Sequence, residues 1–164
     1  MNRKGFTLIE LLAVIVILGI ILTFTVPSIT NIYKESKLKT EGMFLNELSK
    51  SIDSYVTLNS DKIAFNEKKT ATKTENNQNL SVTVYEGKIS IKDLIDDQII
   101  EEKDYINPGN KNVTCEKTTK IVEVYRDSDY VYCYKVNKNK LNCLTDEYKN
   151  SLDSDYAIDT CIWK

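Results

Sequence analysis

The chain of 164 residues carries 22 Lys and Arg against 24 Asp and Glu, has a formal net charge of −2, and contains no His. This length suits one domain of modest size with an additional segment. The slightly acidic balance argues against a basic nucleic-acid-binding face, so no nucleic acid is expected as a partner. The lack of His removes the commonest general base and the commonest zinc ligand.

The N-terminal part of the chain is a long apolar run. Phe6 to Val26 contains a single charged residue, Glu10, and as a helix this run is long enough to cross a bilayer. Arg3 and Lys4 precede it, so the positive-inside rule leaves the N-terminus in the cytoplasm and sends the C-terminal part outside. A secretory signal peptide fits poorly, because the run is longer than a usual apolar region and no A-x-A-like site follows it. An ordinary signal anchor explains the run but not the carboxylate.

The helical pattern continues beyond Pro27, where the apolar run ends. From Ile29 to Val56 apolar residues recur mostly at steps of three or four. We therefore expect one helix over 6–58, kinked or loosened at Pro27 and weakened at Gly42. Residues 6–26 would lie in lipid. Residues 27–58 would continue as an amphipathic helix whose apolar stripe the C-terminal domain covers.

Short polar and β-branched segments follow the helix. Residues 59–79 are polar and are expected to form a loop, and residues 80–164 a domain outside the membrane. Within it, Glu86-Gly87 and Asn107-Pro108-Gly109 predict turns, and Ser90 is the expected cap of a short helix over 90–100. Residues 146–155 allow one further helical turn. Residues 80–85 predict a short strand before the helix over 90–100. The pattern after that helix predicts an antiparallel meander of three or four strands over the segments 113–115, 121–125, 130–136 and 141–144, and residues 157–163 are expected to close the sheet as a last strand.

The four cysteines all lie in the second half of the chain. Their spacing does not resemble the paired short spacing of a zinc site. An even number of cysteines beyond a membrane span is more consistent with two disulfides, because that side is oxidising. Three pairings are open: 133–143 with 115–161, 143–161 with 115–133, and 115–143 with 133–161. The cysteines are Cys115, Cys133, Cys143 and Cys161.

Other candidate sites have ordinary structural explanations. The aspartates of the second half follow no EF-hand pattern, and they are interpreted as turn and surface residues. Tyr130, Tyr132 and Tyr134 alternate along one predicted strand, and this pattern favours packing over recognition. No G-x-S-x-G motif, phosphate-binding loop or supported pair of acids is present. We therefore expect no enzyme activity, no cofactor and no metal site.

The stretch KGFTLIELLAVIVILGII resembles the N-terminal processing segment of type IV pilins and the related pseudopilins. The resemblance covers about the first 30 residues, including Pro27. It implies that a prepilin peptidase removes the leader, residues 1–5, by cutting after Gly5, and that the new amino group of Phe6 is methylated. The apolar helix stays in the mature protein.

The resemblance also implies a fold. Pilins have an α+β architecture in which a long N-terminal helix packs on a small antiparallel sheet domain. Residues 89–134 loosely resemble globular domains of pilin-like proteins from Gram-positive bacteria. Many pilins of Gram-negative bacteria tie down the C-terminal segment with a disulfide, which slightly favours a bond that includes Cys161 without selecting a pairing.

Glu10 is the residue whose role the resemblance changes most. A carboxylate inside a bilayer costs about 2–3 kcal/mol near the centre and less toward the edge. Its side chain could reach the cytoplasmic interface. The resemblance implies instead that Glu10 meets the amino group of Phe6 in an adjacent subunit and sets the register of assembly, a known use of a buried charge.

The expected function is therefore that of a structural subunit. It would be anchored in the cytoplasmic membrane and assembled into a surface fibre for adhesion, motility or biofilm formation. The implied partners are sibling pilins, the prepilin peptidase, an assembly ATPase and its platform protein. One alternative is a pseudopilin of a type II secretion or DNA-uptake system. Another is a single-pass anchored binding domain that does not assemble.

Overall fold

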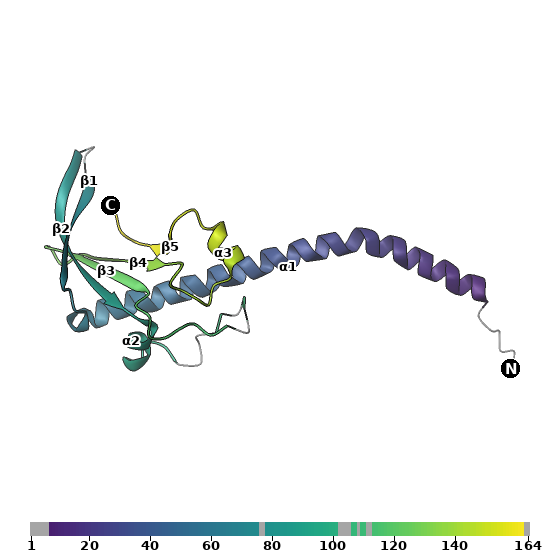
Figure 1. The fold of residues 1–164 in the computed structure, drawn as a ribbon, viewed down its shortest axis with the longest axis horizontal. Helices are drawn as coiled ribbons and strands as arrows, with labels where there is room; N and C mark the ends of the chain where they lie inside the picture. Colours follow the sequence, from purple (N-terminus) through teal and green to yellow (C-terminus); the bar gives the residue numbers. More distant parts are fainter. Residues whose placement is uncertain (1–6, 76–77, 102–105, 108, 111–112, 163–164) are drawn as a thin grey trace. The chain divides into compact units, whose positions relative to one another are not determined.

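The computed structural model describes residues 7–75, 78–101, 106–107, 109–110 and 113–162 (Figure 1). The chain forms a long N-terminal helix followed by a five-stranded antiparallel sheet, so the predicted α+β fold class is confirmed. It divides into two compact units, Met1–Lys39 and Thr40–Lys164.

Helix α1 covers Leu8–Leu58. Its backbone is assigned as helix through Pro27 and Gly42, so neither residue ends it. The long predicted helix is thus present, and the kink at Pro27 stays a prediction. Residues up to Lys39 belong to the first unit, and the last turns of the helix belong to the second.

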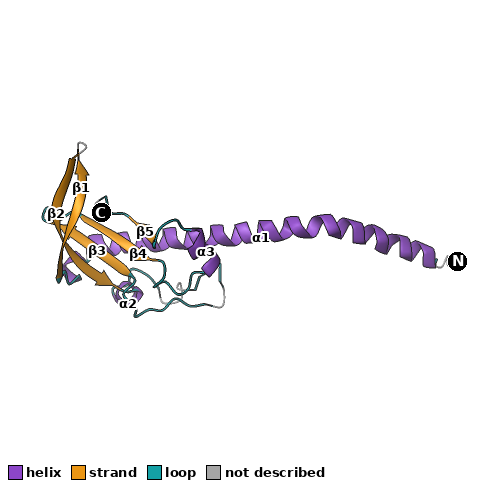
Figure 2. Ribbon diagram, turned by 45° about the horizontal axis from the view of Figure 1, so that its top comes forward, coloured by secondary structure: helices purple, strands orange, loops and turns teal. Residues whose placement is uncertain are grey.

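The sheet is a meander in which each strand pairs with the next along the chain, in the order β1-β2-β3-β4-β5. Figure 2 shows the five strands with the last turns of α1 behind them. All four pairings are antiparallel. The strands are β1 Glu67–Glu75, β2 Gln78–Ile89, β3 Val122–Asp127, β4 Tyr132–Asn137 and β5 Tyr156–Asp159.

Residues 59–79, expected to be a loop, contain the edge strand β1 and a short 3-10 helix η1 at Ser60–Lys62. The prediction was wrong because β1 has the sequence EKKTATKTE, in which Ala71 is the only apolar residue. An edge strand can be polar on both faces, and lysines on it block pairing with other chains. Hydrophobic alternation therefore gives no signal for this strand.

The predicted turn at Glu86-Gly87 is also wrong, since both residues lie inside β2. Glycine is needed there for another reason. A Cβ on Gly87 would lie 2.4 Å from Cγ2 of Ile63, so the strand passes too close to that side chain for any larger residue.

Several shorter predictions are confirmed or corrected. The predicted short helix is α2, Ile91–Asp96, where Ser90 and Asp93 form a capping box. A second short helix, α3, covers Asp146–Ser151.

Two predicted strands are corrected. Residues 141–144 form turns rather than a strand, although their apolar side chains are buried. Near 113–115 there is only an isolated bridge between Ile106 and Thr114.

The core lies between the last turns of α1 and one face of the sheet. The helix and the sheet are also joined by hydrogen bonding, since the Tyr134 hydroxyl lies 2.8 Å from Ser49 Oγ and donates to the Ser49 carbonyl at 3.0 Å. The predicted amphipathic stripe is therefore covered from Phe44 to Val56, whereas its first members, Ile29, Ile32 and Tyr33, are exposed. Its buried members are Phe44, Leu45, Leu48, Ile52, Tyr55 and Val56, packed against residues that include Ile89, Val122, Val124 and Val136.

Two disulfides, Cys115–Cys143 and Cys133–Cys161, are present. This is one of the three pairings that the sequence allowed. Cys115 and Cys143 join the main core, whereas Cys133 packs in a smaller cluster on the opposite face of the sheet. The second bond therefore ties the C-terminal segment across the face of the sheet turned away from α1.

Glu41 is a buried carboxylate that links α1 to the C-terminal part of the domain. Its side chain is fully buried, and its two oxygens accept hydrogen bonds from Thr145, one from the backbone N–H at 3.0 Å and one from Oγ1 at 2.7 Å. Gly109 packs directly on it, since a Cβ there would lie 2.5 Å from Cγ of Glu41. Thr145 is the cap of α3, so Glu41 fixes that helix on α1.

We expect Glu41→Gln to destabilise the domain by about 1–3 kcal/mol, because an amide can accept only one of the two hydrogen bonds and leaves a buried donor unsatisfied. Urea unfolding of the full chain in nonionic detergent, followed by far-ultraviolet circular dichroism, would measure this change. Glu47→Gln alters an exposed acid on the same helix and should change stability by less than about 0.5 kcal/mol. Equal stability of the two variants would contradict the anchoring role of Glu41.

Glu86 is a second buried acid, but it has cationic partners. Its side chain is 1% exposed and forms ion pairs with Lys69 and with Lys88. Burial alone would raise the pKa of Glu86, but the two lysines outweigh burial and hold that pKa below its ordinary value. A lowered pKa in the folded state means that the carboxylate contributes stability above the ordinary carboxyl pKa and loses it as the pH falls through the lowered pKa.

We therefore expect the stability of the domain to fall below about pH 4, and Glu86→Gln to reduce this loss while lowering stability at pH 7. Urea midpoints measured from pH 7 to about pH 2 would test this. The exposed Glu147→Gln should keep the acid-side slope of the wild type. A Glu86→Gln variant with an unchanged slope would contradict the assignment.

Candidate processing and assembly site

The first unit presents an apolar helical surface that the chain itself does not cover. Every large apolar side chain from Leu8 to Phe24 is exposed, from 46% for Val14 to 83% for Leu8, and the exposure continues at Ile29 and Ile32. Leu8–Leu58 contains a segment that is long and apolar enough to cross a membrane. In water such a surface would be strongly unfavourable, at about 25 cal/mol per Å², so lipid or other helices must cover it.

A capping box begins this helix, and Glu10 is part of it. Oε2 of Glu10 accepts hydrogen bonds from the Thr7 backbone N–H at 2.8 Å and from the Thr7 hydroxyl at 2.9 Å. In return Thr7 Oγ1 accepts from the Glu10 N–H at 3.4 Å. The carboxylate therefore satisfies one backbone donor, the Thr7 N–H, at the start of the helix, where the helix dipole also favours a negative charge.

Thr7 is a functional residue that the sequence reasoning missed. The signal was present, because Thr7-Leu8-Ile9-Glu10 matches the S/T-x-x-E pattern of a capping box before an apolar run. Further along, the hydroxyls of Thr23 and Thr25 donate to the carbonyls of Gly19 and Ile21, four residues earlier. These hydroxyls need no water, so the segment remains compatible with lipid.

The predicted site residues fall in different parts of the chain. Gly5 and Phe6, the expected cleavage and methylation positions, lie outside the described residues. Glu10 is exposed in the first turn of α1, and Pro27 lies within the helix. The four cysteines belong to the second unit, where both bonds form.

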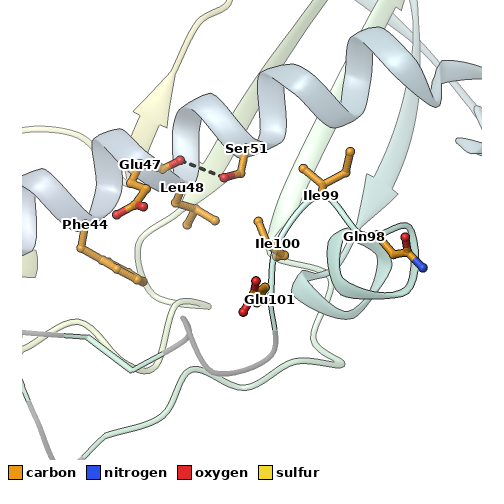
Figure 3. Close-up of a pocket in the computed structure, with 8 residues that line it drawn as sticks. All are labelled: Phe44, Glu47, Leu48, Ser51, Gln98, Ile99, Ile100 and Glu101. Carbon is orange, nitrogen blue, oxygen red and sulfur yellow. Dashed lines mark hydrogen bonds between the residues drawn. The ribbon is translucent and has the colours of Figure 1, made fainter.

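The sheet domain contains a groove of about 330 Å³ between α1 and the segment after α2 (Figure 3). Phe44, Glu47, Leu48 and Ser51 line one side of it, and Gln98, Ile99, Ile100 and Glu101 line the other. In the part of the chain that the structure describes, no group of three or more His, Cys, Asp or Glu side chains could hold a metal ion. This groove offers apolar side chains and two carboxylates, without an arrangement that indicates a reaction.

Comparison with protein families gives a match over the N-terminal part of the chain. The family described as the prokaryotic N-terminal methylation motif matches residues 1–26. This is the signal motif of type IV pilins and pseudopilins, and the architecture that follows it is α+β and pilin-like. Comparisons with curated proteins and with solved structures find no match.

We expect Thr7→Val to loosen the first turn of α1, because it removes the capping hydroxyl at a cost of about 1 kcal/mol, equivalent to about fivefold less protection of the backbone amides. Hydrogen exchange of the amides of residues 8–11, in the full chain in detergent, would measure it. Thr7→Ser retains the hydroxyl and should exchange like the wild type. Equal protection in all three proteins would show that the capping box does not stabilise the helix start.

Proposed function

We propose that this protein is a structural subunit of a type IV pilus-like fibre on the cell surface. The observation that supports this most directly is the methylation motif at residues 1–26, which is followed without a break by the exposed apolar helix. A helix that its own domain leaves uncovered can exchange lipid for the helices of sibling subunits. The same surface thus serves for membrane anchoring and for assembly.

The proposed processing follows from this motif. Prepilin peptidase would remove residues 1–5 by cutting after Gly5, and the amino group of Phe6 would be methylated. Residues 6–26 would then span the membrane, with residues 27–58 leading into the sheet domain. Arg3 and Lys4 before the apolar run and two disulfides beyond it support an orientation with the N-terminus inside and the domain outside.

Glu10 would set the register between subunits. The capping box engages Oε2 with Thr7, and no hydrogen bond joins Oε1 to another residue that the structure describes. Once the chain is cleaved, Phe6 would carry an α-amino group, which becomes a cation when it is protonated. In the apolar centre of a helix bundle, an ion pair between Glu10 and Phe6 of a neighbouring subunit would be strongly preferred over any register that leaves the carboxylate unpaired.

The machinery implied by this role consists of sibling pilins, the prepilin peptidase, an assembly ATPase and a membrane platform protein. The motif is shared by pseudopilins, so a component of a type II secretion or DNA-uptake system is the second candidate function. Recovery of the protein in sheared surface material favours the pilus, whereas retention in the cell envelope favours the pseudopilin.

The first experiment is mass spectrometry of the N-terminal peptide of the protein recovered from membrane and sheared-surface fractions. A peptide that begins at Phe6 and is heavier by one methyl group is expected in both fractions. A peptide that begins at Met1 or Asn2, found in membranes only, would overturn the proposal and leave an uncleaved anchored domain.

Two substitutions separate the charge of Glu10 from its capping role. We expect Glu10→Val and Glu10→Gln to be cleaved and inserted normally, yet to be reduced at least tenfold in sheared fibres, because neither can pair with a cation. Glutamine still fits the capping box, so its failure would be due to the lost charge. The exposed Glu35→Gln should assemble like the wild type. Normal fibres from Glu10→Gln would limit Glu10 to starting the helix.

A further inference from the structure

An unusual cluster of aromatic side chains surrounds Arg126 in the sheet domain. The guanidinium carbon lies 4.7 Å from the ring centre of Phe65, 5.6 Å from that of Tyr85 and 4.9 Å from that of Tyr130. We call these four residues the aromatic–arginine cluster. Stacking of this kind fixes the plane of a guanidinium group.

The N–H donors of the Arg126 guanidinium group have no hydrogen-bond acceptor among the residues that the structure describes. Its contacts there are those with the three rings, and no carboxylate pairs with it. A guanidinium group carries five N–H donors in a planar fork that matches an oxyanion with two parallel hydrogen bonds. Arg126 is half-buried, so its fork is oriented by the protein and unpaired.

Tyr130 completes the cluster in a backbone conformation that is unfavourable for its type. It has a φ of 61°, a region that bulky side chains rarely adopt. Asp127 maintains the turn, since its Oδ1 accepts from the N–H of Asp129 at 2.9 Å and of Val131 at 2.8 Å. The ring is 67% exposed, so packing does not explain the strain. The strained turn instead places an aromatic ring at the surface, against Arg126.

The cluster continues into a polar row along the β1–β2 hairpin. Cross-strand pairing puts Lys68 opposite Tyr85 and Tyr85 opposite Arg126, so all three side chains lie on one face of the sheet. Beyond Lys68 and Tyr85, the described residues on this face of the hairpin carry exposed hydroxyl and amide groups and no carboxylate. We call these residues the hydroxyl row: Thr70, Thr72, Thr74, Asn79, Ser81 and Thr83.

The charge of this face is positive. Lys68 is exposed and makes no ion pair with any residue that the structure describes. The lysines of the opposite face of β1 and β2 differ, since Lys69 and Lys88 are paired with Glu86. Asp53 of α1 lines a groove of about 380 Å³ together with Tyr132, the cross-strand partner of Arg126, and does not belong to the hairpin. Among the described residues, this face of the sheet thus carries two cations, Lys68 on β1 and Arg126 on β3, that have no ion-pair partner.

We propose that the aromatic–arginine cluster and the hydroxyl row bind a carboxylated polysaccharide. The carboxylate of a uronic acid unit accepts the fork of Arg126, the Tyr130 ring stacks on a sugar face, and the following units lie along the hydroxyl row. Lys68 adds attraction for the polyanion. This site belongs to the sheet domain and goes beyond the proposed fibre role, so it can be tested on unassembled protein.

Other occupants explain fewer of these features. A polyphosphate would engage Arg126 and Lys68 but has no ring to stack on Tyr130. A neutral glycan would use Tyr130 and the hydroxyl row but leave the guanidinium fork without an oxyanion. An acidic peptide offers carboxylates, yet it has no row of hydroxyls to match a row of threonines.

The test is isothermal titration calorimetry on the full chain in nonionic detergent at low ionic strength, with a hexasaccharide of linked mannuronate as the probe. Mannose hexasaccharide, polyphosphate of equal charge and hexaglutamate serve as comparison ligands. Arg126→Lys keeps the charge but loses the fork, and Tyr130→Asn removes the ring with a residue that tolerates positive φ. Lys68→Gln is matched by Lys92→Gln, an exposed lysine on α2.

We expect saturable binding of the mannuronate probe that is weakened about tenfold by Arg126→Lys, one bidentate contact being worth about that factor, and about fivefold by Tyr130→Asn. Lys68→Gln should weaken it more than Lys92→Gln. The proposal is overturned if the probe does not bind, if any comparison ligand binds as tightly, or if Arg126→Lys and Tyr130→Asn bind like the wild type. Concentration-dependent self-association that both variants abolish would also overturn it in favour of a second copy of this chain.

Discussion

The central constraint on this protein is that one continuous helix needs two different surroundings. From Leu8 to Phe24 the helix exposes apolar side chains all around, which only lipid or other helices can cover. From Phe44 to Val56 it exposes an apolar stripe on one side, and the sheet covers that stripe. The helix therefore contributes an apolar surface in the first unit and part of the core in the second.

The sheet domain is joined to the last turns of α1 by hydrogen bonds as well as by apolar packing. Tyr134 and Glu41 make hydrogen bonds between α1 and segments that lie 85 and 104 residues away in sequence, respectively. If the helix shifted against the sheet, these hydrogen bonds would break and leave buried polar groups without partners, which costs free energy. The hydrogen bonds therefore fix the orientation of the helix on the sheet more specifically than apolar packing alone. The two disulfides restrain the C-terminal half, and the cysteines of one of them, Cys115 and Cys143, are themselves part of the main core.

The start of the helix illustrates how one residue can serve two needs. The Glu10 carboxylate caps the helix through Thr7, which accounts for its presence in a single chain. Capping uses hydrogen bonds and leaves the net negative charge in place. The Glu10 carboxylate lies in an apolar surface, and no described residue forms an ion pair with it, so pairing with a cation of another subunit would be favourable. The capping role of Glu10 is therefore compatible with its proposed role between subunits.

The sequence by itself determined the long helix, its apolar and amphipathic parts, the processing motif and the α+β class, because these depend on local periodicity and on residues that are adjacent in the chain. The capping box of Thr7 and Glu10 was also readable locally. Strand β1 could not be predicted from the local sequence, because its polar residues form a strand through pairing with β2. Only the tertiary structure decided the cysteine pairing, the burial of Glu41 and the grouping of Phe65, Tyr85 and Tyr130 around Arg126. Each of these features brings together residues from distant segments of the chain. Such contacts depend on the register of the sheet, and no single position in the sequence determines that register.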